Sequence, residues 1–204
     1  SDALFPTGAY AHPLGLEEFV RLGVVSDAAT LKRFVIEQVI PAQREQELPY
    51  LRFAWRAARA GDLAELRRVD LEVDAWKLAS ELREASAQVG ARRLKALLRI
   101  SDAPFLIAFD RLVSDRVCRG HHLVVCGLQS AIVGVPLDVA LLTAFYQAIA
   151  AICAASMKLI RIGQDACQMI LREACGHAEK AVAHSFAVER RAAGWFNPAL
   201  EIAS

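Results

Sequence analysis

Apolar residues recur at intervals of three and four along most of the chain, which is the spacing of one face of an α-helix. The first such helix is predicted to begin at Asp27, whose carboxylate suits an N-cap, and Pro41 is placed to end or kink it. Its apolar face is formed by Leu31, Phe34, Val35 and Val39. Strand-like alternation is rare, and no Asn-Gly or Asp-Gly hairpin turn occurs. The pattern therefore predicts an all-α protein.

Turn and capping residues divide the pattern into further amphipathic helices. A second helix is predicted to close at Gly61, and a third to open at Asp62. A later helix should start near Pro104, with Ser101 or Asp102 as its cap. The apolar positions of the second and third helices are Leu48, Leu51, Trp55 and Ala58, followed by Leu63, Leu66, Val69, Val73 and Trp76.

The character of the chain changes beyond Gly120. Segments 123–134 and 139–157 are apolar on all sides, which places them in the centre of a helical bundle with the amphipathic helices outside. No linker rich in Ser, Gly or Pro divides the chain. We therefore predict one all-α domain over residues 1–204, with residues 1–15 as a non-helical N-terminal arm.

Two long uncharged runs call for a comparison with a membrane span. The run 123–137 is short for a bilayer and contains Gly134 and Pro136. The run 139–157 is long enough, but it is mostly alanine and has no adjacent basic cluster. A buried helical pair is the better interpretation, and no membrane partner is expected.

Composition and charge narrow the class of protein. The 204-residue chain is 55% hydrophobic with a net charge of +1, which favours a globular fold and gives no reason to expect a nucleic-acid partner. Its five cysteines form no C-x-x-C pair, which suits a reducing compartment. The first residues do not follow the pattern of a signal peptide. We expect a cytoplasmic protein.

Motifs for catalysis or cofactor binding are absent from the sequence. It has no phosphate-binding G-x-x-x-x-G-K-[S/T], no dinucleotide-binding G-x-G-x-x-G, no G-x-S-x-G and no H-E-x-x-H. No close pair of carboxylates sits in an apolar setting. We therefore expect no enzymatic activity and no bound cofactor.

The best candidate for a metal site is the segment 118–126, CRGHHLVVC. Its Cys118, His121, His122 and Cys126 offer two thiols and two imidazoles, which suit Zn²⁺ or Ni²⁺. The spacing matches no standard closed site, and a cysteine in an apolar run often acts as a small hydrophobe. Ordinary histidines at a helix start are the competing interpretation.

Two further segments are unusual. Residues 2–19 hold aromatic residues and His12 between prolines and glycines, and such a segment either docks on its own domain or meets another protein. Residues 81–99 place several cations on a predicted helix, where a solvated face is the simpler explanation. Gly90 within this helix costs about 1 kcal/mol relative to alanine, which suggests a close approach by another helix.

These segments together resemble the UreF family of urease accessory proteins. Residues 3–17 (ALFPTGAYAHPLGLE) are similar to its S-x-x-F-P-x-G-x-F/Y-x-H-S-x-G-L-E signature, and residues 81–94 (ELREASAQVGARRL) to its E-x-R-x-A-S-x-x-x-G segment. Residues 120–127 (GHHLVVCG) resemble its Gly-His loop, and residues 158–168 (KLIRIGQDACQ) its R-L-x-P-L-G-Q-x-x-x-Q stretch. Residues 194–204 resemble the start of its C-terminal tail. The segments occur in the family's order over nearly the whole chain.

The resemblance implies an all-α, dimer-forming scaffold without activity of its own. Such a protein pairs with the UreD/UreH accessory protein, recruits the GTPase UreG and supports GTP-dependent insertion of nickel into apo-urease. The residues that it implies for partner binding are Phe5, Pro6, Gly8, Tyr10, His12, Glu17, Arg83, Lys158, Arg161, Gln164 and Gln168.

The chain departs from the family pattern at two of these positions and at one neighbouring position. Pro13 stands where serine is usual, Lys158 where arginine is usual, and Arg161 where proline is usual. A lysine keeps the charge but loses the bidentate guanidinium, so a contact that needs arginine at 158 is in question. Gln164 and Gln168 could alternatively cap or bridge helices within the chain.

Two other functions compete with the scaffold hypothesis. One is a nickel-carrying chaperone that binds the metal on Cys118, His121, His122 or Cys126. The other is a GTPase-activating protein that supplies a catalytic arginine in trans, for which Arg83, Arg92, Arg93 and Arg161 are the candidates.

Overall fold

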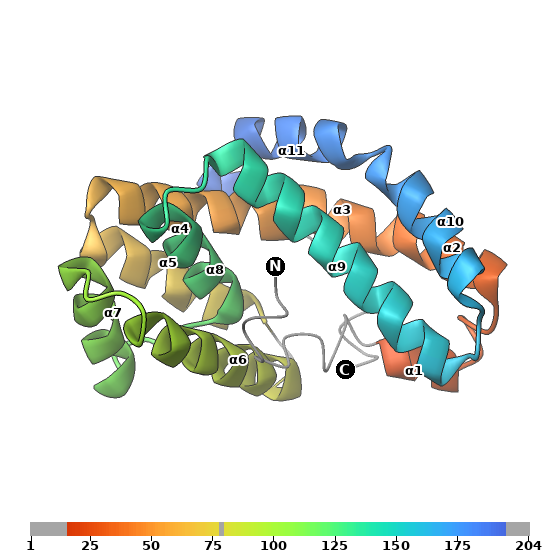
Figure 1. Ribbon diagram of the computed structural model, residues 1–204, viewed down its shortest axis with the longest axis horizontal. Coiled ribbons are helices and arrows are strands. Elements are labelled where there is room, and N and C mark those ends of the chain that lie inside the picture. The colour runs from red at the N-terminus through yellow and green to blue at the C-terminus, as the bar shows by residue number, and fades with distance from the viewer. Residues whose placement is uncertain (1–15, 78–79, 195–204) are drawn as a thin grey trace. The chain divides into compact units, whose positions relative to one another are not determined.

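The computed structural model describes residues 16–77 and 80–194, and the regular structure in these ranges is helical throughout (Figure 1). The prediction of an all-α fold is therefore confirmed. The N-terminal arm and the residues after Gly194 lie outside the described ranges. The elements in chain order are α1 (Leu16–Arg21), α2 (Ala28–Phe34), η2 (Val35–Val39), α3 (Ile40–Ala42), η3 (Gln43–Glu47), α4 (Leu48–Ala60), α5 (Leu63–Trp76), α6 (Ser80–Leu98), α7 (Pro104–Ser114), α8 (His122–Ile132), α9 (Leu137–Leu159), α10 (Gln164–Cys175), α11 (Ala178–Ala187) and η4 (Arg190–Ala192).

The described chain divides into two compact units. Unit 1 comprises residues 50–140, and unit 2 comprises residues 16–49 together with 141–194. Helices α4 and α9 each begin in one unit and end in the other. The single domain inferred from the sequence stays a prediction, because this division by itself does not show whether the units fold separately.

Helix ends follow the capping residues at most predicted positions. The Asp27 carboxylate accepts the N–H of Thr30 in a capping box, and the Asp62 carboxylate accepts the N–H of Glu65. Gly61 follows α4 with a φ of +67°, the left-handed conformation that glycine adopts without strain. The expected cap at Ser101 or Asp102 is wrong, since α7 starts at Pro104 after Ala103 and no side chain caps it.

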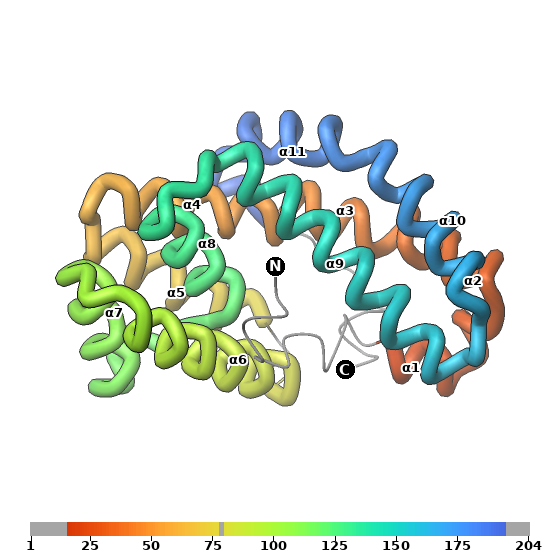
Figure 2. Tube along the Cα trace, in the orientation of Figure 1, coloured from red at the N-terminus to blue at the C-terminus, as the bar shows by residue number. Residues whose placement is uncertain are grey.

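Pro41 was predicted to end or kink its helix, and the first of these alternatives does not occur. Residues 28–49 instead form a continuous helical rod (Figure 2), in which the π-helical turns η2 and η3 each end two residues before a proline, at Pro41 and Pro49. A proline has no N–H for the carbonyl four residues earlier, and its ring clashes with that carbonyl in a regular α-helix. The wider π-turn before each proline relieves this conflict, so the helix continues.

The core of unit 1 is built around α8, which packs along α6 and also contacts α5. Most of its residues between Leu123 and Ala131 are buried. A Cβ added to Gly127 would lie 2.8 Å from the Leu51 carbonyl oxygen of α4, closer than real Cβ atoms approach other atoms. Glycine thus allows α8 and α4 to approach closely, and α8 matches the predicted central apolar helix.

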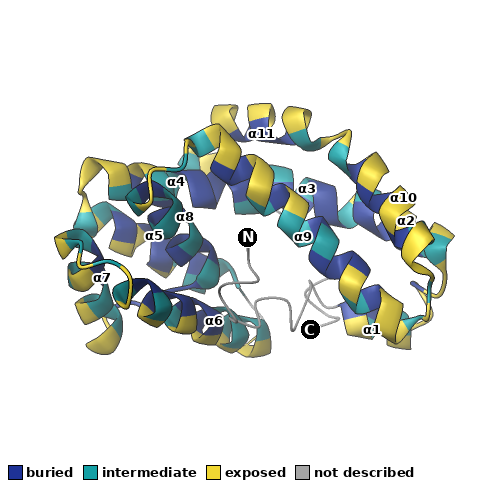
Figure 3. Ribbon diagram, viewed as in Figure 1, coloured by how far each residue is buried: buried dark blue, intermediate teal, exposed yellow. Residues whose placement is uncertain are grey.

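Helix α9 is buried along one face and exposed along another (Figure 3). In unit 2 its buried face includes Phe145 and Ile149, whereas Tyr146 is 49% exposed and Met157 is 39% exposed. By length and composition α9 could cross a membrane, as the core helix of a soluble protein also could. One side of α9 is buried as predicted, but the other side is exposed in the described residues, so the expected position covered on all sides is not observed for this helix.

Candidate functional site

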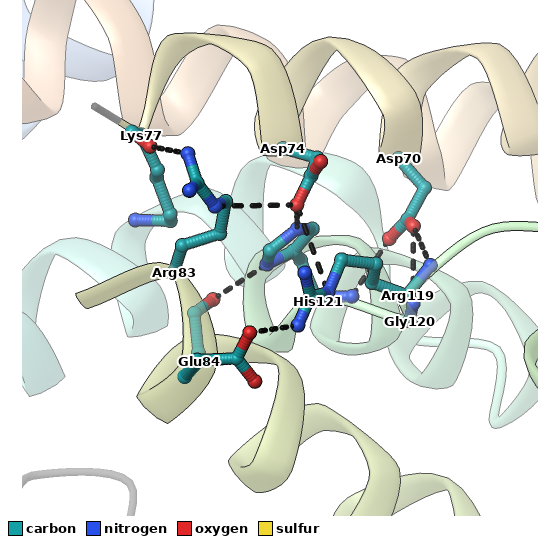
Figure 4. Close-up of polar contacts among 9 residues, drawn as sticks. Asp70, Asp74, Lys77, Arg83, Glu84, Arg119, Gly120 and His121 are labelled. Atoms are coloured by element: carbon teal, nitrogen blue, oxygen red, sulfur yellow. Dashed lines mark hydrogen bonds and ion pairs between the residues drawn. The ribbon is translucent and has the colours of Figure 1, made fainter. Parts of the chain in front are cut away.

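The Gly-His loop of unit 1 is held by a buried carboxylate (Figure 4). Asp70 of α5 accepts three consecutive backbone N–H groups: its Oδ2 lies 2.7 Å from the nitrogen of Arg119 and 3.0 Å from that of Gly120, and its Oδ1 lies 2.7 Å from that of His121. Asp70 is fully buried. Hydrogen bonds from N–H groups to a charged acceptor are stronger than neutral ones, so this contact fixes the loop to α5.

His121 is fully buried and joins α5 to α6. Its Nε2 lies 3.1 Å from Asp74 Oδ1, and its Nδ1 lies 3.2 Å from Ser86 Oγ. A carboxylate oxygen only accepts, so in the neutral ring Nε2 carries the hydrogen and the Ser86 hydroxyl donates to Nδ1. Burial lowers the pKa of His121 below its ordinary value and outweighs the opposite effects of Asp70 and Asp74.

Two arginines complete this network. Arg83 Nη1 donates to the Lys77 carbonyl oxygen at 2.8 Å, and its Nε lies 4.0 Å from Asp74 Oδ1. Arg119 lies 3.7 Å from the same Asp74 oxygen and also pairs with Glu84 (Figure 4). The predicted partner-binding residue Arg83 is thus anchored within its own unit, with 30% of its side chain exposed.

Gly90 explains how α6 comes close enough to the Gly-His loop. A Cβ at this position would lie 1.9 Å from the Gly120 carbonyl oxygen and 2.8 Å from the backbone nitrogen of His122. Gly120 has a φ of +67°. The close approach expected from Gly90 is observed, but it is made by the Gly-His loop at the start of α8 and not by the body of another helix. Two family-like motifs distant in sequence thus form one structural network.

A second candidate site lies at the connection between α9 and α10 in unit 2. Lys158 is in the last turn of α9, Arg161 is in the connection, and Gln164 and Gln168 are on α10. All four are exposed, and among the described residues none of these side chains has a hydrogen bond or ion pair. Within the described residues, Gln164 and Gln168 form no such cap or bridge, and the alternative remains a prediction.

The backbone of Arg161 has a φ of +54°, which is unfavourable for a residue with a long side chain. Residues in such conformations cluster at functional sites. Exposed apolar side chains flank the polar groups: Leu159 is 37% exposed and Met169 is 70% exposed. We call Met157, Lys158, Leu159, Arg161, Gln164, Gln168 and Met169 the α9–α10 surface. Its mixture of unpaired polar and apolar groups is typical of a protein-binding surface.

The structure brings two of the four candidate metal ligands, His122 and Cys126, into contact, but it does not form a metal site from all four. His121 is engaged by Ser86 and Asp74, whereas Cys126 Sγ lies 3.5 Å from Nε2 of His122 one turn earlier. Burial raises the pKa of the Cys118 thiol to about 12, which opposes the thiolate form that binds metals. Within the described ranges, no three His, Cys, Asp or Glu side chains are placed to hold a metal ion together.

The candidate arginines differ in how they are held. Arg93 is buried on α6 and donates to the Gln129 side-chain oxygen at 2.8 Å, and Arg92 contacts the carbonyl of Gln88 in its own helix at 3.4 Å. Arg83 is anchored as described above. Arg161 alone among these four is exposed without such a contact in the described structure.

The remaining predicted residues are less informative. Glu17 is exposed in the first turn of α1. The other five predicted partner-binding residues lie outside the described residues: Phe5, Pro6, Gly8, Tyr10 and His12.

Sequence reasoning missed Asp70 and Asp74. Both lie on α5 one turn apart, beside the apolar positions Val69 and Val73. An aspartate next to the buried face of an amphipathic helix was the only available signal. It did not identify the partner, because the loop that Asp70 binds is 49 to 51 residues further along the chain.

Comparisons with known proteins place this architecture in a family. The UreF family model matches residues 25–175. The urease accessory protein UreF of Actinobacillus pleuropneumoniae serotype 3 (strain JL03) is 31% identical over 170 residues, which cover 83% of this chain and 75% of the relative. That of Haemophilus influenzae (strain PittGG) is 30% identical over 185 residues, covering 91% of this chain and 79% of the relative.

A third relative comes from a different genus. The urease accessory protein UreF of Paenarthrobacter aurescens (strain TC1) is 31% identical over 179 residues, which cover 85% of this chain and 75% of the relative. The family model and the relatives agree over most of the chain. The chain therefore belongs to the UreF family of urease accessory proteins.

Proposed function

We propose that this urease accessory protein is a non-catalytic scaffold that acts in the cytoplasm as a homodimer. On this proposal it binds UreD/UreH, and the pair recruits the GTPase UreG for GTP-dependent insertion of nickel into apo-urease. Family membership supports the urease context. The specific partners follow from the sequence motifs that the chain shares with the family.

The observation that carries the scaffold proposal is the α9–α10 surface. Four polar side chains and three apolar ones are exposed at one helix connection, and the polar ones have no partner in the described chain. Because these polar groups form no hydrogen bond within the described chain, none has to break when they bind another protein. They would fix the orientation of the partner and reject partners without matching groups. We assign this surface to the recruitment of UreG.

A GTPase-activating role is the second candidate, and the state of Arg161 favours it over the other arginines. An arginine that reaches a bound nucleotide must be exposed and not held by its own protein. Among the four candidates Arg161 meets both conditions. The two roles differ in the measured quantity, because a catalytic arginine changes GTP turnover whereas a binding arginine changes affinity.

The experiment combines Lys158→Ala with Gln164→Ala and measures assembly with UreD/UreH and GTP-loaded UreG by size-exclusion chromatography with light scattering. We expect a metal-free dimer that enters the complex only with UreD/UreH, with UreG affinity at least about tenfold lower in the double variant. The melting temperature should change little, because both side chains are exposed. Lys180→Ala with Gln88→Ala, also exposed, is the matched control.

Each other outcome points to a different function. Unchanged UreG affinity in the double variant would contradict the assignment of this surface. A loss of GTP turnover of about 10³-fold in Arg161→Ala, with complex assembly intact, would favour the activating role. One nickel ion retained per isolated chain would favour a metal carrier.

A further inference from the structure

Two buried cysteines of unit 2 lie side by side where α9 and α10 meet. Cys153 is on α9 and Cys167 is on α10, 14 residues apart in the chain, and each is 4% exposed. The Cys167 thiol donates to the Cys153 carbonyl oxygen at 3.4 Å, and the Cys153 sulfur lies 3.8 Å from the Cys167 carbonyl oxygen. Because each sulfur lies beside the backbone of the other residue, the two thiols are neighbours.

The surroundings keep this pair ordered and slow to react. Ser156 is fully buried, and its hydroxyl donates to the Cys153 carbonyl oxygen at 2.8 Å and lies 4.0 Å from the Cys167 sulfur. Burial, together with the neighbouring Cys167, raises the pKa of the Cys153 thiol to about 12. This thiol is therefore protonated at neutral pH, and both cysteines are reduced in the structure.

A bond between these two sulfurs would close residues 154–166 into a loop. The loop contains Lys158, Arg161 and Gln164 of the α9–α10 surface. In the chain-entropy description, such a bond acts mainly by restricting the unfolded and partly opened forms of the chain. A thiol is a weak hydrogen-bond donor, so oxidation gives up only weak contacts. A disulfide would thus order the α9–α10 surface while the two helices stay in contact.

We propose that Cys153 and Cys167 are a redox-responsive site that forms a reversible disulfide in response to hydrogen peroxide. Peroxide oxidises one thiol to a sulfenic acid, and a water molecule is released. The second thiol attacks the sulfur of the sulfenic acid, the S–S bond forms, and its hydroxyl leaves as a second water molecule. The two thiols together lose two hydrogen atoms, and the peroxide is reduced to water. Transient disulfides of this kind are the usual ones in a reducing compartment.

The first experiment treats the isolated full chain with hydrogen peroxide in native buffer, blocks the remaining thiols by alkylation and maps crosslinked peptides by mass spectrometry. We expect a crosslink between Cys153 and Cys167 that is at least about tenfold more abundant than any other pairing of the five cysteines. Dithiothreitol should remove it. The melting temperature of the oxidised chain should rise by about 5 °C or more.

Cys175→Ala is the matched control, since Cys175 is the third cysteine of unit 2 and lies partly exposed at the end of α10. This variant should keep both the crosslink and the rise in melting temperature, whereas Cys167→Ala should lose both. The mapping in the natural chain decides even if Cys167→Ala folds poorly. The absence of the Cys153–Cys167 crosslink, or its formation only after unfolding in urea, would overturn the proposal.

The effect on partner binding rests on the proposed function, whereas the disulfide is a property of this chain alone. After removal of peroxide, the oxidised and reduced chains are compared in their affinity for UreG in the presence of UreD/UreH. We expect about threefold tighter binding by the oxidised chain, because its α9–α10 surface is ordered in advance. Equal affinities with the crosslink present would refute this regulation. The Lys158 and Gln164 substitutions test the recruitment of UreG separately.

Discussion

His121 is the residue whose chemistry most directly links the structure to a measurable pH dependence. Its folded-state pKa is lowered below the ordinary value of 6.5, mainly by burial. Between the lowered pKa and 6.5, the unfolded chain binds a proton that the folded chain does not. The free energy of unfolding should therefore rise with pH through this window and level off above it. Below the folded-state pKa both states are protonated, and the contribution of His121 becomes constant.

His121→Gln removes this titration. We expect the free energy of unfolding of the natural chain to rise more steeply than that of the variant as the pH rises from the lowered pKa to 6.5, by at most about 1.4 kcal/mol per pH unit. Urea titrations at several pH values measure both slopes. The variant should be less stable at pH 7.5, because the contacts of His121 to Ser86 and Asp74 change. Parallel pH profiles would mean that His121 does not titrate as proposed.

At the scale of helices, local signals predicted the structure well where the cause is local. Asp27, Gly61 and Asp62 marked helix ends because capping involves only neighbouring residues. The helix end that was one of the two alternatives for Pro41 does not occur, because the energetic conflict of a proline can be relieved by a wider turn as well as by a helix end. That choice depends on the packing of the whole rod.

The same distinction between local and long-range causes applies to the predictions of the candidate sites. The sequence indicated that Gly90 is approached closely, because a glycine inside a helix is less stable than alanine and is expected where another segment leaves no room for a side chain. It also located the α9–α10 surface, where cations and glutamines interrupt an apolar stretch. It could not show that the Gly90 helix and the Gly-His loop meet through Asp70, since no sequence pattern relates groups about fifty residues apart. Nor did it separate the anchored Arg83 from Arg161, which has no partner in the part of the chain that the structure describes.

The attachment of the Gly-His loop to α5 gives a prediction at this scale. Asp70→Asn leaves one oxygen and one NH₂ group where two oxygens accept three N–H groups, so at least one buried donor loses its partner. We expect a loss of about 3 kcal/mol in the free energy of unfolding, measured by urea denaturation. Asp102→Asn, at an exposed position, should change it by less than about 0.5 kcal/mol. A similar small effect of Asp70→Asn would show that the carboxylate does not hold the loop.

At the scale of the whole molecule, the question is whether the two units unfold together. Helices α4 and α9 each have residues in both units. If one unit unfolds, the part of each helix that lies in it is lost, and the other unit keeps two shortened helices. Helix formation is cooperative along a segment, and shortened ends are costly to keep ordered. We therefore expect a single cooperative transition, as the single-domain prediction requires.

Asp70→Asn provides the means to measure this coupling, because its effect originates in unit 1. If the units unfold together, the slowest-exchanging amides of α2 and α10 in unit 2 should lose the same free energy of protection as those of α6 in unit 1. Far-ultraviolet circular dichroism and, in a Trp195→Phe background, tryptophan fluorescence should then report coincident urea transitions, since the remaining Trp55 and Trp76 both lie in unit 1. Unchanged protection in α2 and α10 would instead mean that the units are separate domains. Shared helices would then link the two units of the chain without making them one folding unit.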